Sequence, residues 1–255
     1  MDLYYEVLKR PVFTINDICG FYNNIESARS AVKRLLGKGR IIHIRNNLYT
    51  AISGETGAPL ANRFQIASSV TDTSYVTHHT AMEYYGITDQ VFYDVYVGSE
   101  TAFQSFVFDG YTYRYVHSRF PDGIEDIEYS GGVRVTDRER TVLDSIKDMD
   151  KIAGAEEVID NLGAIKLVKE GRIIQYLALY NNQFLYQKTG YLLSRVQNKL
   201  GLSDMFFELC RDKAGKSTRY LSSDHKNGVY DSEWKLVVPE ILFQSKNGEL
   251  TDADI

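Results

Sequence analysis

The first fifty residues constrain the fold more than any other part of the chain, because capping and turn-forming residues divide them into short segments. Pro11 ends a first predicted helix over residues 3–9, since proline has no backbone N–H to donate. Thr14 stands where the N-cap of a second helix belongs, and residues 15–21 continue that helix. The pattern therefore predicts two short helices at the start of the chain.

A third predicted helix and a hairpin follow. Asn23 or Asn24 can cap a helix from Ile25 to about Leu36, and the glycines after it can adopt the left-handed geometry of a helix end. Residues 40–52 are rich in β-formers on both sides of an Asn-Asn turn, which predicts a hairpin. Three helices and then a hairpin are the element order of a winged helix-turn-helix domain.

The third helix separates into two faces at 100° per residue. Its apolar face contains Ile25, Ala28, Ala31, Val32, Leu35 and Leu36. The opposite face is cationic and carries small hydroxyls, which suits phosphates and the base edges of a major groove. The hairpin turn is placed to reach an adjacent backbone or minor groove. The predicted DNA contacts are Arg29, Ser30, Lys33, Arg34, Arg45, Asn46 and Asn47.

The distribution of charge supports this interpretation. The whole chain has 29 Lys and Arg against 34 Asp and Glu, a formal net charge of −5. Residues 1–50 hold 8 basic against 4 acidic residues, whereas the remainder holds 21 against 30. A basic segment attached to an acidic remainder is expected of a protein that binds nucleic acid at one end. The alternative is that the lysines and arginines only solvate a helix face.

The 255 residues are enough for two domains, and 44% hydrophobic with 25% charged residues is an ordinary globular composition. The turn-rich segment 53–60 marks a boundary. We expect a mixed α/β (α+β) fold: a winged helix over residues 1–55, a larger mixed body over 61–240 whose C-terminal part is helical, and a flexible tail over 245–255.

Composition also bears on the cellular setting. No run approaches the 18 or so apolar residues that a membrane helix needs, and the first residues lack the order of a signal peptide. Cys19 and Cys210 lie far apart, and neither belongs to a C-x-x-C pair. We therefore expect a reduced, cytoplasmic protein with no membrane partner.

Few residues suggest catalysis. Glu233 and Lys235 form an E-x-K pair on a predicted strand, as in metal-dependent nucleases, but alternation around a buried Trp234 explains them as a solvated face. His78 and His79 are helix neighbours that diverge by about 100° and cannot chelate together; a helix start suits them better. We expect no catalytic residue, no metal site and no cofactor.

A capping box is predicted at Thr136 and Glu139, at the start of a helix through Ile146. Basic residues surround this box, next to Asp137. We expect them in surface ion pairs: Arg134, Arg138 and Arg140.

Three segments together resemble the AbiEi family of antitoxins from type IV toxin–antitoxin and phage abortive-infection systems. Residues 39–49 are similar to the family's wing, residues 74–86 to the strand and helix that open its second domain, and residues 135–144 to the strand and helix that follow. The resemblance extends over most of residues 1–240. One departure is Asn47, where the family often has glycine before the wing tyrosine; asparagine also tolerates the left-handed turn.

The resemblance implies a bacterial protein that binds repeats in its own promoter and represses its operon. It also implies that the body counteracts a nucleotidyltransferase-like toxin encoded beside it, without necessarily binding the toxin, and it leaves self-association open. The contacts to promoter DNA that it implies are Arg29, Lys33, Arg34, Arg45 and Asn47.

Two alternatives stay open. One is a winged-helix regulator whose body senses a ligand or a partner unrelated to a toxin. The other is a nuclease that uses Glu233 and Lys235. The identity of the neighbouring gene distinguishes the antitoxin from the first alternative, and metal-dependent cleavage of DNA would indicate the second.

Overall fold

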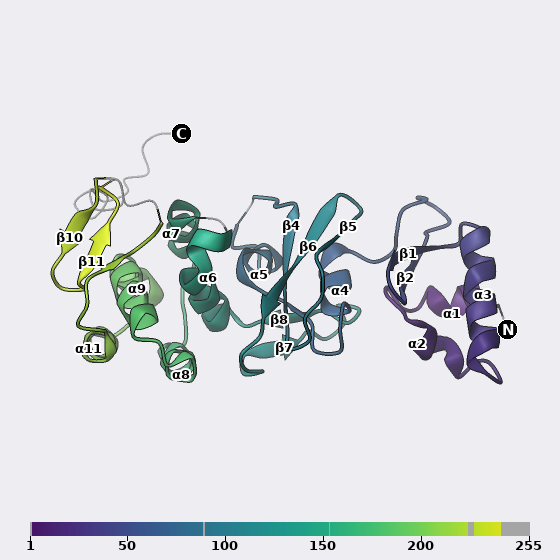
Figure 1. Ribbon diagram of the computed structural model, residues 1–255, viewed down its shortest axis with the longest axis horizontal. Coiled ribbons are helices and arrows are strands. Elements are labelled where there is room, and N and C mark those ends of the chain that lie inside the picture. The colour runs from purple at the N-terminus through teal and green to yellow at the C-terminus, as the bar shows by residue number, and fades with distance from the viewer. Residues whose placement is uncertain (1, 89, 153, 224–226, 241–255) are drawn as a thin grey trace. The chain divides into compact units, whose positions relative to one another are not determined.

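The computed structural model describes residues 2–88, 90–152, 154–223 and 227–240, and it has the expected mixed α+β fold (Figure 1). The chain divides into two compact units. The first unit contains Met1–Thr80 and Val91–Thr136, and the second contains Ala81–Gln90 and Asp137–Ile255. None of the described helices is long and apolar enough to cross a membrane.

The division between the units differs from the predicted domains. The predicted boundary at residues 53–60 lies inside the first unit, and the predicted body over 61–240 is shared between both units. The predicted tail, residues 245–255, lies outside the described residues.

The N-terminal head, residues 2–52, has the predicted order of three helices and a hairpin. Its elements are α1 (Leu3–Val7), α2 (Ile15–Cys19), α3 (Ile25–Gly37), β1 (Ile41–Arg45) and β2 (Leu48–Ala51), drawn in purple to blue in Figure 1. The two strands are antiparallel, with His43 opposite Tyr49 and an irregularity before Arg45. The capping residues act as expected: the side chains of Thr14 and Asn24 accept hydrogen bonds from backbone amides in the first turns of α2 and α3.

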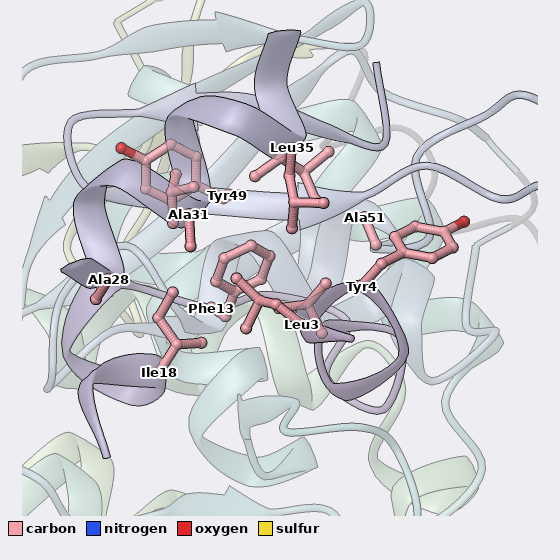
Figure 2. Close-up of a cluster of buried hydrophobic side chains, with 12 residues drawn as sticks. Leu3, Tyr4, Phe13, Ile18, Ala28, Ala31, Leu35, Tyr49 and Ala51 are labelled. Carbon is pink, nitrogen blue, oxygen red and sulfur yellow. The ribbon is translucent and has the colours of Figure 1, made fainter. Parts of the chain in front are cut away.

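One apolar cluster holds the head together (Figure 2). Its members come from all three helices and both strands: Leu3, Tyr4, Val7, Phe13, Ile18, Ala28, Ala31, Val32, Leu35, Ile41, Tyr49 and Ala51. Phe13, between α1 and α2, pairs with Tyr49 through two backbone hydrogen bonds of 2.9 Å, and their rings stack at 5.7 Å. The hairpin is therefore fastened to the helices by backbone pairing as well as by burial.

The segment that leaves the head is bonded to the hairpin. The Leu60 amide donates to the Ala51 carbonyl at 2.9 Å, and the Ala61 amide donates to the Thr50 hydroxyl at 3.1 Å. An isolated antiparallel bridge joins Ile52 to Pro59. Residues 53–60 therefore form a closed loop on the hairpin rather than a free tether.

The rest of the first unit is a six-stranded mixed sheet in the order β5-β6-β4-β3-β8-β7, with α4 (Arg63–Ser68) packed near its centre. Its strands are β3 (Tyr75–Val76), β4 (Asp94–Ser99), β5 (Phe106–Phe108), β6 (Tyr111–His117), β7 (Ile124–Asp126) and β8 (Arg134–Thr136). Strands β5 and β6 form a hairpin around Asp109-Gly110, and both turn residues have positive φ, 50° and 80°.

The second unit is mainly helical, as predicted for the C-terminal part. Its helices are α6 (Arg138–Ile152), α7 (Ala155–Ala164), α8 (Glu170–Tyr180), α9 (Gln183–Ser194), α10 (Gln197–Leu200) and α11 (Asp204–Lys213), and α5 (His78–Tyr84) is shared with the first unit. A three-stranded sheet ends the described chain: β9 (Arg219–Tyr220), β10 (Val229–Asp231) and β11 (Leu236–Val238) in the order β10-β11-β9.

The predicted capping box at Thr136 and Glu139 is wrong by one residue. Thr136 ends β8, and α6 begins at Arg138. Asp137 takes the cap position, where its Oδ1 accepts from the Arg140 amide at 2.8 Å. Glu139 instead accepts from the Lys169 amide at 2.7 Å. Thr136 is kept in the strand by its antiparallel pairing with Ile124 of β7, and the helix starts after it.

The prediction of a surface ion pair is wrong for Arg140. Its side chain is 1% exposed, and its Nε lies 3.6 Å from a carboxylate oxygen of Asp144, which is also buried. Tyr180 from α8 donates a hydrogen bond to that carboxylate. Arg138, two residues earlier on the helix, is exposed. The start of α6 therefore carries a buried charged network whose partners come from another helix.

Candidate nucleic-acid interface

Helix α3 has one buried and one exposed face, as its sequence predicts, but Ile25 of the predicted apolar face is 40% exposed. Ala28, Ala31, Val32 and Leu35 are buried in the head cluster. The predicted contact residues on the opposite side are all exposed: Arg29, Ser30, Lys33 and Arg34. The core therefore fixes the helix and directs its polar side chains to solvent.

The cations on this face differ in how they are engaged. Arg29 Nη1 lies 2.6 Å from the Glu26 carboxylate, one turn earlier, and both side chains are largely exposed. Among the described residues, Lys33 and Arg34 take part in no ion pair and no side-chain hydrogen bond. These two cations are therefore the ones most readily offered to an anionic ligand.

The hairpin turn uses its asparagines in different ways. Asn47 has φ of 55°, the left-handed geometry that asparagine was expected to tolerate. Its Oδ1 accepts from the Ile15 amide at 3.1 Å, which ties the turn to the start of α2. Asn46 is exposed. Asn47 therefore has a structural role in the head, and Asn46 is the freer of the two predicted contacts.

Arg45 is placed differently from the other predicted contacts. Its guanidinium carbon lies 5.2 Å from the ring centroid of Phe103 and 4.9 Å from that of Phe106, both in the sheet part of the first unit. Burial lowers the pKa of Arg45 from its ordinary value. Contact between Arg45 and DNA remains a prediction, and it requires the guanidinium to leave these rings.

Four exposed cations of the head were not among the predicted contacts: Lys9 and Arg10, which pair with Glu6 and Asp17, and Lys38 and Arg40. Lys38 follows the last turn of α3, and Arg40 lies 4.7 Å from the ring centroid of Tyr4. Both add to the basic surplus of residues 1–50. That surplus was the sequence signal for them, since neither falls on the helical face that the periodicity selects.

The residues of the nuclease alternative lie elsewhere in the chain. Glu233 is exposed and pairs with Arg211 at 2.8 Å, and Lys235 has φ of 52° in a turn, so the predicted strand begins only at Leu236. The predicted burial of Trp234 is confirmed, at 1% exposure. No group of three or more His, Cys, Asp or Glu within the described ranges is arranged to hold a metal ion.

The adjacent histidines start α5, as expected. His79 Nε2 lies 3.0 Å from the Asp94 carbonyl oxygen. Because a carbonyl only accepts, that nitrogen carries the proton. The His79 ring stacks on Phe92 at 4.3 Å, and burial lowers its pKa to about 4. His79 is therefore a neutral side chain that supports the helix start.

Comparison with known proteins identifies a shared fold. No family model matches the chain, and no curated protein matches it. Among solved structures, the RV2827C protein from Mycobacterium tuberculosis is similar, with a TM-score of 0.62 over 93% of this chain and 90% of that chain. The two sequences are 13% identical. At this identity the likeness shows that the overall fold is shared and does not extend to function.

Proposed function

We propose that the protein binds double-stranded DNA through the exposed face of α3. The observation that carries the proposal is the combination of a helix fixed by a buried apolar face with Lys33 and Arg34 exposed and unpaired among the described residues. A helix of this kind presents base-reading and phosphate-binding groups on a backbone that is already ordered, and the fit to a major groove follows from its dimensions.

The electrostatic balance supports the same proposal. The basic surplus is confined to the head in a chain whose net charge is −5. Phosphate contacts by lysine and arginine release counterions and supply most of the non-specific affinity for DNA. The acidic remainder repels DNA, which favours binding by the head alone.

We further propose that DNA binding serves autorepression in a type IV toxin–antitoxin operon and that the protein is a cytoplasmic antitoxin with no catalytic activity of its own. The support is the resemblance of residues 39–49, 74–86 and 135–144 to the AbiEi family, in the family's order. On this proposal the remainder of the chain counteracts a nucleotidyltransferase-like toxin, with or without direct contact.

Fluorescence anisotropy with labelled DNA from upstream of the protein's own gene tests the first proposal. The wild-type protein should bind this DNA more tightly than a shuffled duplex of equal composition. Lys33→Ala with Arg34→Ala should weaken specific binding by about 1–3 kcal/mol. Lys213→Ala with Lys216→Ala removes the same charge from exposed positions of the second unit and should leave affinity unchanged. Equal affinity of all three proteins would contradict the proposal.

Co-expression tests the antitoxin proposal. Cells that express the product of the adjacent gene should recover growth when this protein is present. The Lys33→Ala, Arg34→Ala variant should still rescue, because neutralisation is assigned to the rest of the chain. Failure of the wild-type protein to rescue would leave a DNA-binding regulator unrelated to a toxin.

A further inference from the structure

The wing arginine is held by an aromatic pair that is itself well supported. The ring of Phe106 stacks on Tyr113 at 4.6 Å with an interplanar angle of 4°. The ring of Phe103 packs edge-on against Tyr115 at 5.4 Å. The Arg45 guanidinium lies within about 5 Å of both phenylalanine rings, which is the geometry of a cation–π contact. The rings therefore form a preorganised cation–π site for one guanidinium.

This cation–π site does not satisfy all of the N–H hydrogen-bond donors of Arg45. Nη1 of Arg45 is buried and has no hydrogen-bond partner within the described part of the chain. A guanidinium has five N–H donors, and a ring face attracts its charge without accepting a directed hydrogen bond as an oxygen does. A phosphate oxygen would satisfy the donor and keep the charge compensated. Arg45 therefore has two competing places to lie.

We propose that Arg45 is a switchable DNA contact: it is seated on Phe103 and Phe106 in the free protein and moves to a phosphate when the head binds DNA. The inference rests on the proposed DNA binding and adds its regulation. Because the buried Nη1 cannot reach a phosphate while the guanidinium stays on the rings, Phe103 and Phe106 compete with DNA for this cation. By linkage, whatever displaces the guanidinium from the rings raises the affinity for DNA.

The proposal predicts opposite effects for the two sides of the contact. Phe103→Leu with Phe106→Leu keeps apolar volume but removes the ring faces, so DNA binding should tighten about three- to tenfold. Arg45→Ala should weaken binding and lower the slope of log affinity against log salt by about 0.9, the loss of one phosphate contact. If Arg45 only fastens the head to the sheet, both variants should weaken binding or leave it unchanged.

The experiment is a double-mutant cycle measured by anisotropy with the upstream DNA over a range of salt concentrations. The leucine variant should bind more tightly than wild type with the same salt slope, and the gain should vanish in the Arg45→Ala background. Thermal melts establish that each variant is folded, and Phe103→Leu alone replaces the double variant if that one is not. Two results would overturn the proposed switch and leave the proposed DNA binding standing, provided that the wild-type protein binds. One is no gain of affinity in the leucine variant, and the other is an unchanged salt slope in Arg45→Ala. Absence of wild-type binding would overturn the proposed function itself.

Discussion

Helices α3 and α6 are both rich in charged residues, yet α3 displays its charges, whereas the first turns of α6 bury most of theirs. Lys33 and Arg34 on α3 are exposed. Asp137, at the cap of α6, is 2% exposed, and Arg140 is 1% exposed. Binding requires charge that a ligand can reach, so the buried charges at the start of α6 cannot serve as an interface, whereas Lys33 and Arg34 can.

The difference arises from the elements that pack against each helix. The buried face of α3 meets apolar side chains. The start of α6 meets α8, whose Arg172 Nη1 donates to the Asp137 carboxylate at 2.9 Å and whose Tyr176 hydroxyl donates to it at 2.5 Å. These partners lie 35 and 39 residues further along the chain. Whether a charged helix segment is exposed or buried therefore depends on partners that lie far along the chain, and the local periodicity of the sequence does not reveal them.

The largest expected effect is the loss of Asp137. Replacing it with alanine removes a buried acceptor, leaves Arg172 and Tyr176 without it, and deletes the cap of α6. Losing the acceptor of a buried network costs about 3–5 kcal/mol when all its partners are buried; the share of Arg172 is smaller because that side chain is 40% exposed. A lost cap costs about 1 kcal/mol more. Urea unfolding measures the loss. Asp212→Ala, at an exposed position of α11, is the matched control and should change stability by less than about 0.5 kcal/mol. Equal losses of stability in Asp137→Ala and Asp212→Ala would contradict the claim that buried charges stabilise the fold and exposed charges do not.

A second prediction contrasts the buried Trp234 with its neighbours in the same turn, the exposed Glu233 and the half-buried Lys235. Trp234 packs so closely on α9 that a Cβ added at Gly190 would lie 2.0 Å from its ring. Trp234→Ala should cost about 3–5 kcal/mol in a urea melt. Glu233→Ala with Lys235→Ala, on either side of it, should cost less than about 0.5 kcal/mol and leave unchanged the toxin neutralisation that we propose for the protein. Loss of neutralisation at unchanged stability would assign a function to this turn.

A third prediction extends the comparison to a buried neutral group. The pKa of His79 is about 4 in the folded protein, because burial penalises the charged ring, against an ordinary value of 6.5. Between pH 6.5 and about 4, the His79 ring is protonated in the unfolded chain but stays neutral in the folded protein. The stability that His79 contributes is therefore fully present above pH 6.5 and is lost as the pH falls toward 4, by at most about 3 kcal/mol.

Urea melts between pH 4 and pH 7 measure this dependence. His79→Gln can still donate to the Asp94 carbonyl but does not titrate, so its profile should be flatter over this range. The Lys33→Ala, Arg34→Ala variant should keep the wild-type profile, because its exposed side chains stay charged throughout. A wild-type profile as flat as that of His79→Gln would show that the ring is not held neutral.

Sequence alone predicts those parts of the molecule in which a local signal determines the structure. Helix α3 follows from its capping asparagine and its period, and the β5–β6 hairpin follows from Asp109 and Gly110. The exposure of Lys33 and Arg34 follows from the same period. In each case the deciding residues lie within a few positions of one another.

The remaining features depend on contacts between distant segments. The pairing of Phe13 with Tyr49, the parallel pairing of β3 with β8, and the place of Asp137 in a buried network are all set by such contacts. The position of Arg45 is another example, because Phe103 lies far along the chain from the β1–β2 hairpin. No sequence motif near Arg45 indicates that its guanidinium packs on the rings of Phe103 and Phe106.

The most direct test of the central claim is the salt dependence of DNA affinity in the wild-type protein, the Lys33→Ala, Arg34→Ala variant and the Lys213→Ala, Lys216→Ala control. If α3 lies on DNA, the slope of log affinity against log salt should fall by up to about 2 in the α3 variant, near 0.9 for each lost phosphate contact, and should stay at the wild-type value in the control. Identical slopes and affinities in all three proteins would contradict the assignment of α3 as the DNA-binding surface.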